Sequence, residues 1–331
     1  MTGKRLPMTN ESAPLTAIER RKKSRKRLPP WFKTYLPTGD AQIAFNDVRG
    51  SVSEHGLNTV CQEAQCPNIH DCWGRGTATF MVAGEQCTRA CRFCAVGTVK
   101  VPPPLDVDEP EKLAEAVDLM GVTHAVITCV NRDELSDGGA GHYRACLEAV
   151  HARRPDVGLE FLCSDLDGNL DALSTLLDGL ELRVFAHNVE CVPRLDSVVR
   201  DHRASFQQSL EILKEAKRLR PDILTKSSIM VGVGETDEEV VGAMRLLREV
   251  DVDLLTIGQY LAPSPSHLTV DRFPEPEVFV KWDEKARELG FKAVACGPLV
   301  RSSYRAGLLY EEAKGGPVTL TYGESCISET L

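Results

Sequence analysis

Two groups of three cysteines are the residues of this 331-residue chain whose type and spacing could do chemistry. Cys61, Cys66 and Cys72 form a C-x4-C-x5-C group, and Cys87, Cys91 and Cys94 form a C-x3-C-x2-C group. Thiolates are good ligands for zinc and for iron–sulfur clusters, whereas disulfides are disfavoured inside the cell, where we expect this chain to be. The two groups therefore predict metal centres rather than covalent cross-links.

The number and spacing of the thiols favour iron–sulfur clusters over zinc. Structural zinc needs four ligands and usually shows paired C-x2-4-C half-sites separated by a longer stretch, which neither group does. Three cysteines can hold three corners of a [4Fe–4S] cube and leave one iron for another ligand, so two groups indicate two cubes. Spacing alone leaves one alternative open, in which six thiolates are shared over one or two zinc ions with His55 or His70 as extra ligands.

The remaining six cysteines are scattered along the chain. We expect five of them to be small buried hydrophobic side chains rather than ligands. These five are Cys129, Cys146, Cys163, Cys191 and Cys296. Cys326 lies near the end of the sequence, in a segment that we expect to be a loose tail.

The elements that must position the cysteines come from an alternation of strand-like and helix-like segments that begins at Thr77. Strands are predicted at 77–82, 124–130, 158–163, 182–188, 225–231 and 254–259, and helices near 109–120, 141–153, 170–177, 205–220, 237–250 and 277–289. This alternation is typical of βαβ units around a parallel sheet. The predicted fold class is α/β, a partial and open TIM-type barrel of about six units.

The polarity of the barrel predicts the position of the active site. Active sites of such folds lie at the carboxyl ends of the strands, and the second cysteine group follows the first strand directly. Polar residues also follow later strands, so they could converge on the same mouth. These residues are Asn131 to Asp133, His187 to Glu190, Gly232 to Glu235, and Gln259 with Tyr260. Taken singly, each of these segments is also typical of helix caps and turns.

Composition and charge narrow the classes of function. The chain has 39 basic and 48 acidic residues and a formal net charge of −9, which argues against nucleic acid as a partner. Residues 1–30 differ, with nine basic residues and two acidic ones, and we interpret them as a solvated tail. The sequence shows neither an apolar run of transmembrane length nor a secretory signal, so we expect a cytoplasmic protein without a membrane partner. There is also no G-x-G-x-x-G or Walker A motif for nucleotide binding.

The motifs taken together resemble those of the lipoyl synthase family of radical S-adenosylmethionine (SAM) enzymes, over about residues 30–313. A C-x3-C-x2-C group alone would indicate only the wider superfamily. The resemblance becomes specific through the upstream cysteine group and the downstream Arg301-Ser-Ser-Tyr304. Further matching segments are 59–68, 76–81, 131–133, 187–190, 256–261 and 301–306. One departure is Cys191, where the family pattern has threonine.

The resemblance implies an activity and a set of cofactors. The activity is the SAM-dependent radical insertion of two sulfur atoms at C6 and C8 of a protein-bound octanoyl chain, which gives the lipoyl cofactor. The cofactors are SAM and two [4Fe–4S] clusters. By resemblance, Cys87, Cys91 and Cys94 bind the cluster that takes SAM, and the auxiliary cluster donates the sulfur.

The resemblance also assigns further site residues. Cys61, Cys66 and Cys72 bind the auxiliary cluster, and its fourth ligand is a serine of the Arg-Ser-Ser-Tyr motif, Ser303 in preference to Ser302. An alkoxide is a harder donor than a thiolate, which suits an iron that must be released. Three side chains are candidates for contacts with SAM: Phe93, Glu190 and Arg203.

The implied partners are an octanoylated lipoyl-carrier protein or domain, an electron donor such as flavodoxin or ferredoxin, and an iron–sulfur carrier that rebuilds the auxiliary cluster. The expected organisation is a basic tail at 1–30, an N-terminal extension with the auxiliary cluster motif at 31–76, the barrel at 77–291 and a C-terminal segment at 292–331. We expect both extensions to cover the barrel mouth.

Two other functions compete with sulfur insertion. One is a different two-cluster radical enzyme that transfers a methylthio group to RNA or protein, and the acidic composition argues against RNA. The other is a zinc-binding interaction module, which would bind zinc and would not cleave SAM.

Overall fold

The computed structural model describes residues 27–32, 38–54, 59–63 and 66–316. Most of the predicted basic tail lies outside the described residues, and so do His55 and Cys326. Trp31 and Phe32 are described, and the ring of Phe32 meets that of Phe273 edge to face, with 5.5 Å between the ring centroids. Phe32 is thus packed against a residue far along the chain.

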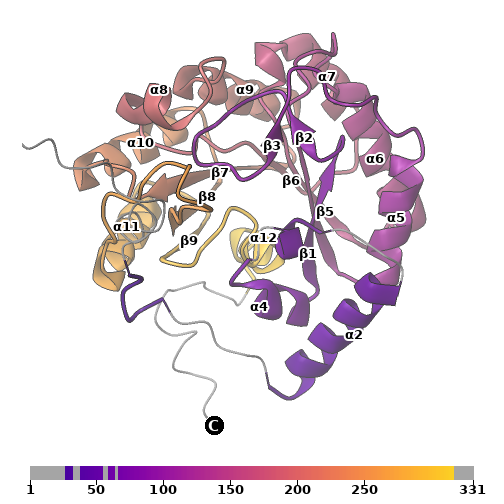
Figure 1. Cartoon of the computed structure of the whole chain (residues 1–331), viewed down its shortest axis with the longest axis horizontal. Helices are drawn as coiled ribbons and strands as arrows, with labels where there is room; N and C mark the ends of the chain where they lie inside the picture. Colours follow the sequence, from indigo (N-terminus) through magenta and orange to yellow (C-terminus); the bar gives the residue numbers. More distant parts are fainter. Residues whose placement is uncertain (1–26, 33–37, 55–58, 64–65, 317–331) are drawn as a thin grey trace, which may run out of the picture.

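A parallel sheet of seven strands forms the centre of the molecule (Figure 1). Its strands lie side by side in chain order: β1 (Thr77–Val82), β4 (His124–Cys129), β5 (Gly158–Leu162), β6 (Val184–Ala186), β7 (Leu224–Val231), β8 (Leu254–Gln259) and β9 (Ala293–Gly297). β1 and β9 are the two ends of this order and do not pair with each other, so the barrel is open. The predicted partial TIM-type barrel is confirmed.

The sheet has one strand more than the six predicted. All five residues of β9 are buried, and the strand pairs with β8 in parallel. Its sequence, Ala-Val-Ala-Cys-Gly, is short and built mainly of small residues, so it carries a weak strand signal. The sheet therefore continues past residue 291, where the sequence analysis placed the end of the barrel.

Helices cover the outer face of the sheet because each carries one apolar face. They are α5 (Glu109–Leu119), α6 (Ala140–Arg153), α7 (Leu170–Leu177), α9 (Phe206–Leu219), α10 (Asp237–Glu249) and α11 (Pro276–Glu288). Local signals set where they start. Ser205 caps α9 by accepting from the backbone N–H of Gln208, and Thr236 and Glu239 form a reciprocal capping box at α10. Among the described helices, none has the length and apolarity needed to cross a membrane.

Two short strands and several short helices complete the chain around the mouth. The strands are β2 (Gln86–Cys87) and β3 (Gly97–Thr98), which pair with each other in parallel. The helices are η1 (Leu166–Gly168), η2 (Pro193–Leu195) and α8 (Asp196–Val199). β2 ends at Cys87, the first residue of the second cysteine group, and β3 follows Cys94, so their pairing closes the loop that carries the group.

The two extensions lie at different places. On the N-terminal side, α3 (Val60–Glu63) and α4 (Ile69–Gly74) lie beside β1, with Trp73 fully buried, and α2 (Asp40–Glu54) packs on α4. On the C-terminal side, α12 (Ala306–Ala313) packs its Leu309 among the first residues of β6 to β9. A Cβ at Gly307 would meet His124, the first residue of β4.

The expectation that both extensions cover the mouth is therefore wrong for α12, which closes the opposite, amino-terminal end of the barrel. The physical reason is its apolar face: Leu309 is fully buried there, and Leu308 and Tyr310 pack against the same cluster. Apolar side chains that would otherwise face water at that end of the barrel are covered by the helix.

Candidate functional site

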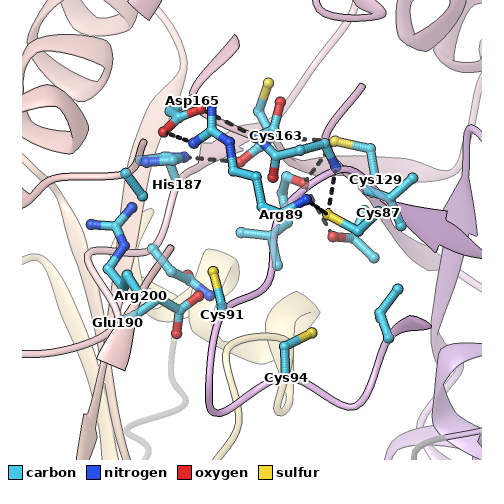
Figure 2. A pocket seen from close by; sticks show the side chains of 18 of the residues that line it. Cys87, Arg89, Cys91, Cys94, Cys129, Cys163, Asp165, His187, Glu190 and Arg200 are labelled. Carbon is cyan, nitrogen blue, oxygen red and sulfur yellow. Dashed lines mark hydrogen bonds and ion pairs between the residues drawn. The ribbon is translucent and has the colours of Figure 1, made fainter. Parts of the chain in front are cut away.

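A pocket of about 250 Å³ opens at the carboxyl ends of the first four strands of the sheet order, β1 to β6 (Figure 2). Its walls come from the ends of β1, β4 and β5, from residues 187–190 after β6, and from the loop that carries the second cysteine group. Cys87, Cys91 and Cys94 all line it. This candidate pocket thus lies at the end of the barrel where its polarity predicts an active site.

Backbone N–H groups point at the sulfur atoms of this group. Cys87 Sγ accepts from the N–H of Arg89 at 3.4 Å and from that of Asn131 at 3.3 Å. Cys91 Sγ accepts from the N–H of Asp201 at 3.3 Å. Such donors stabilise a sulfur that carries negative charge, which is the state of a metal-bound thiolate.

Burial keeps the free thiols protonated. It raises the pKa of Cys87 and Cys94, and it raises the pKa of Cys91 to about 11. At neutral pH the group is therefore uncharged until a metal displaces the protons. The backbone donors then face two of the three sulfur atoms in the state that they stabilise, so the pocket fits a metal centre with thiolate ligands.

The spacing of the thiols argues against a single ion. Ligands of one tetrahedral zinc ion lie about 3.8 Å apart, given a Zn–S bond of about 2.3 Å. Within the described part of the chain, the only group with three ligand atoms all within 4.8 Å of one another is Glu109, His142 and Cys146, which belongs to neither cysteine group. Glu109 there accepts from the Ala83 N–H and hydrogen-bonds His142, which explains that group without an ion. The wider spacing suits a cube, in which each thiolate takes a different iron.

A buried ionic network holds the cysteine loop against the barrel. The Arg89 guanidinium pairs with Asp133 at 2.8 Å and with Asp165 at 2.5 Å. These carboxylates follow β4 and β5, so one side chain ties the loop to two strand ends. Asp201 Oδ2 accepts from the Ala90 N–H at 2.9 Å, on the other side of the loop.

Arg203 belongs to this network and does not line the pocket. Its guanidinium pairs with Asp133 at 3.0 Å and with Asp201 at 2.9 Å, and it donates to the carbonyl of Thr88 at 2.6 Å. The structure therefore places this predicted SAM contact behind the loop. Arg200, which the sequence analysis did not single out, lines the pocket instead.

The wall opposite the cysteines carries two polar side chains, Glu190 and Asn188, which hydrogen-bond to each other. Glu190 lines the pocket with φ of 66°, a left-handed conformation that is unfavourable for a side chain of this size, and burial raises its pKa. Asn188 Oδ1 is buried and has no hydrogen-bond partner. A buried carboxyl on a strained backbone, beside an amide oxygen without a partner, is typical of a wall that receives a ligand with donor groups. Phe93 lines the pocket as well and offers an apolar face.

His187 lines the same pocket but is fully engaged. Its Nδ1 lies 2.9 Å from the carbonyl of Cys163 and its Nε2 lies 2.9 Å from Ser209 Oγ. Burial lowers its pKa to about 4, so the ring is neutral at physiological pH. We interpret His187 as a brace between the end of β5 and helix α9 rather than as an acid or base.

The first cysteine group forms a separate site on the N-terminal side. Cys61 lies on α3, Cys72 lies on α4, and Cys66 lies between them with its N–H donating to the Cys61 carbonyl at 3.0 Å. Burial raises the pKa of Cys66, and it raises the pKa of Cys72 to about 12. As in the pocket, the thiols lose their protons only when a metal takes their place.

The segment that contains the two serines comes to this site from the other end of the chain. Asn68 Nδ2 donates to the Leu299 carbonyl at 2.6 Å, and Asp71 pairs with Arg305 at 2.7 Å. The backbone N–H of Arg305 also donates to the thiol of Cys72. Ser302 and Ser303 lie between these two anchors along the chain. The structure thus brings the serine motif to the first cysteine group, as predicted.

Ser303 has a defined position in this segment. Its Oγ accepts a hydrogen bond from Thr79 Oγ1 at 3.0 Å, and Thr79 lies on β1, the strand that α3 and α4 contact. Arg301 is half-buried in the same segment, and its charge lowers the pKa of the Cys66 thiol against the larger effect of burial. A cation this close favours a thiolate at Cys66.

Comparison with protein families gives two matches. The Radical SAM superfamily matches residues 81–247, which is half of the chain and contains the second cysteine group. The N-terminal domain of lipoyl synthase of the Radical SAM family matches residues 7–66, which contain Cys61 and Cys66.

Curated relatives match along most of the chain. The chloroplastic lipoyl synthase of Arabidopsis thaliana is 51% identical over 288 residues, which cover 85% of this chain and 72% of that protein. The lipoyl synthase of Marinobacter nauticus is 49% identical over 290 residues, covering 88% and 82%. The mitochondrial lipoyl synthase of Bos taurus is 48% identical over 296 residues, covering 88% and 78%.

Among solved structures, the FeFe-hydrogenase maturase HydG from Carboxydothermus hydrogenoformans superimposes with a TM-score of 0.54 at 14% identity. The match covers 77% of this chain and 64% of that protein, which is just under two thirds of its length. At this identity the likeness concerns the fold alone, and it agrees with the open barrel described above.

Proposed function

The chain belongs to the lipoyl synthase family of the radical SAM superfamily, and on that premise we propose which of its residues hold the cofactors. Membership gives the activity: SAM-dependent radical insertion of two sulfur atoms at C6 and C8 of an octanoyl chain carried by a protein. It also gives the cofactors, SAM and two [4Fe–4S] clusters. When bound, the clusters and SAM supply a carbon-centred radical and the sulfur that is inserted.

We propose that Cys87, Cys91 and Cys94 hold the cluster that binds SAM. The observation that carries this assignment is the pocket itself, because all three thiols line it together with the strained Glu190. Backbone N–H groups already face two of the sulfur atoms, so the loop needs little rearrangement to receive a cluster.

The opposite wall would then bind SAM. The Glu190 carboxylate and Asn188 Oδ1 are acceptors suited to an amino group, and the Arg200 guanidinium is suited to a carboxylate. Phe93 offers an apolar face to the adenine ring. Arg203 acts through the loop that it braces, and we now propose it as a positioning residue.

We propose that Cys61, Cys66, Cys72 and Ser303 hold the auxiliary cluster. The support is the contact between the segment of the first cysteine group and the serine segment, through the pairs Asn68 with Leu299 and Asp71 with Arg305. The hydrogen bond from Thr79 holds the Ser303 hydroxyl beside β1 and favours Ser303 over Ser302 as the fourth ligand.

The carrier of the octanoyl chain is a protein, as the family activity requires. Flavodoxin or ferredoxin as electron donor, an iron–sulfur carrier that rebuilds the auxiliary cluster, and a cytoplasmic location are further parts of this proposal. The named relatives include chloroplastic and mitochondrial proteins as well as bacterial ones, so family membership alone is compatible with several compartments.

The test is sulfur insertion by the full chain, reconstituted with iron and sulfide without oxygen. We would supply SAM, dithionite and an octanoyl-lysyl peptide, and follow 5′-deoxyadenosine and the peptide mass. The wild type should add two sulfur atoms. Ser303→Ala should still cleave SAM but should leave the peptide without sulfur, whereas the matched Ser302→Ala should retain insertion.

The reverse outcome for the two serine variants would move the ligand to Ser302. Full insertion by both variants would show that the serine motif supplies no ligand. Failure of the wild type to cleave SAM, with both clusters loaded, would contradict the assignment of the pocket.

A further inference from the structure

Two cysteines outside the cluster motifs lie next to each other in the wall of the pocket. Cys129 is the last residue of β4, and Cys163 follows the last residue of β5. The parallel register of these strands ends with Thr128 opposite Leu162, so Cys129 and Cys163 occupy the next pair of positions. Both line the pocket, and Figure 2 shows them at the strand ends above Arg89.

The side chain of Cys129 reaches across to the neighbouring strand. Its sulfur accepts from the Ser164 N–H at 3.3 Å and lies 3.9 Å from the Leu162 carbonyl oxygen. These two residues flank Cys163 in sequence. The Cys129 sulfur is thus held against the backbone on both sides of Cys163.

The backbone spacing suits a covalent bond between the two residues. Neighbouring strands lie about 4.8 Å apart, and disulfides join Cα atoms that are about 4.4 to 6.8 Å apart. The two side chains have the same parity in adjacent strands, so they stand on the same face of the sheet. The remaining requirement is a rotation of the side chains, which is easy for an unbranched residue.

The electrostatics identify the thiol that would react first. Burial raises the pKa of Cys129, but hydrogen bonds from the Cys163 thiol and the Ser164 amide outweigh it, so that the pKa is lowered overall. Burial raises the pKa of Cys163 well above its usual value. Cys129 is also the more exposed of the two, since Cys163 is only 4% exposed. A partly exposed thiol of lowered pKa with a second thiol beside it is the arrangement found in redox-sensitive sites.

We propose that Cys129 and Cys163 form a reversible disulfide that makes the SAM pocket sensitive to small organic disulfides. The inference rests on the proposed function, because it takes this pocket to be the SAM site. The other described cysteines outside the cluster motifs, Cys146, Cys191 and Cys296, are buried as expected, and so is Cys163, whereas Cys129 is partly exposed and can be reached from the pocket.

The reaction is a two-step exchange. The Cys129 thiolate attacks one sulfur of the small disulfide, forms a mixed disulfide and releases the first small thiolate. The Cys163 thiol then loses its proton and attacks the Cys129 sulfur, and the second small thiolate leaves. Two protein thiols are oxidised, one small disulfide is reduced to two thiols, and the two protons end on those thiols.

The disulfide would change the pocket because both sulfur atoms belong to its wall. Closing the bond pulls the Cys129 side chain away from the Ser164 N–H and over Cys163, beside Asp165, which pairs with Arg89. Arg89 in turn holds the loop that carries Cys87 and Cys91. Oxidation is therefore expected to weaken SAM binding without touching a cluster ligand.

The experiment uses the reconstituted full chain, kept free of oxygen and treated with bis(2-hydroxyethyl) disulfide. Free thiols are then blocked with N-ethylmaleimide, and the chain is digested with trypsin. The wild type should yield a reducible cross-link between peptide 113–132, which holds Cys129, and peptide 154–183, which holds Cys163. SAM affinity should fall several-fold and should recover after reduction with a phosphine.

Matched variants separate this pair from other thiols. Cys163→Ala should give no cross-link, and its SAM affinity should not respond to the oxidant, whereas Cys296→Ala should behave as the wild type does. Absence of the cross-link in the wild type, or a cross-link that leaves SAM affinity unchanged, would overturn the inference.

Iron is measured in the same samples. A protein that holds both clusters but forms no cross-link contradicts this inference alone. A protein that forms the cross-link but fails to load iron contradicts the proposed function. The disulfide between Cys129 and Cys163 is still supported in that case.

Discussion

The two cysteine groups are positioned in different ways. The thiols of Cys87, Cys91 and Cys94 belong to one short loop, and the barrel holds that loop by buried ion pairs from the ends of β4 and β5. The other group lies on short helices outside the sheet, and its anchors come from residues more than 230 positions away in the sequence. The pocket site is thus built into the core of the fold. The N-terminal site depends on a contact between residues 68–71 and residues 299–305.

This difference fits the two tasks that the family activity requires. A cluster that stays and serves repeatedly gains from a rigid, buried support. A cluster whose sulfur is transferred has to be taken apart and rebuilt, and a site joined from two segments can open without unfolding the barrel. A substitution in the support of one site should therefore weaken cluster binding at that site and leave the other site unchanged.

The largest effect is expected at Arg89. Arg89→Met removes the buried charge, leaves Asp165 without its ion-pair partner and leaves Asp133 with Arg203 alone. Breaking a buried pair in this way costs about 3–5 kcal/mol of the free energy of unfolding. Denaturant titration would measure the loss, and iron analysis should show that the cluster of the pocket is lost while the other is retained. Equal loss of both clusters would contradict independent support.

A smaller effect, at the N-terminal site instead of the pocket, is expected at Asp71. Asp71→Asn weakens the pair with Arg305, which is only partly buried, so we expect a cost of about 1 kcal/mol. Iron should be lost from the N-terminal site and SAM binding should be unchanged. A variant that binds SAM less tightly would show that the two sites are coupled.

The same pair predicts a pH dependence. Burial alone would raise the pKa of Asp71, but Arg305 and Arg75 outweigh it and lower that pKa below its usual value of 3.8. The stabilisation from this carboxylate is therefore complete above that value and is lost as the pH falls below it. Acid unfolding of the wild type and of Asp71→Asn should differ above pH 4 and converge at lower pH.

A modest effect is expected at Thr79. Thr79→Val removes the hydroxyl that donates to Ser303 Oγ and keeps the shape of the side chain, so we expect a cost of about 0.5–1.5 kcal/mol. The auxiliary cluster should load less completely. Thr128→Val, which removes a similar strand hydroxyl at the pocket, is the matched control and should leave auxiliary loading unchanged.

The smallest effect is expected at His187. Because burial lowers its pKa to about 4, the ring does not titrate between about pH 6 and 8. SAM affinity of the wild type and of His187→Gln should therefore follow the same pH profile in this range. A step near pH 6.5 that is present only in the wild type would show that His187 changes charge in the pocket.

Much of the barrel could be predicted from the sequence because its signals are local. The α7 boundaries agree with the prediction at 170–177, where Asn169 caps the helix by accepting from the Ala172 N–H. β9 was missed because a short run of small residues carries little strand signal. The position of α12 was predicted wrongly, because the cluster that receives Leu309 is formed only when four strand ends meet.

The candidate site could likewise be predicted only in part from local sequence signals. Regular cysteine spacing pointed to both cluster motifs, and the serine motif is found where it was expected. Arg203 and Arg200 are only three residues apart, and the sequence offers no signal for which of them turns toward the pocket. The positions of Asn188 and of the pair Cys129 with Cys163 in the pocket wall are set by strand register. That register depends on the whole sheet.

The most direct test counts iron and sulfide in three forms of the full chain, each reconstituted without oxygen. The forms are the wild type, a Cys61→Ala/Cys66→Ala/Cys72→Ala variant and a Cys87→Ala/Cys91→Ala/Cys94→Ala variant. The account predicts about eight irons and eight sulfides in the wild type and about four of each in either variant. Zinc in place of iron, or a triple variant that loses all of its iron, would contradict two separately held clusters.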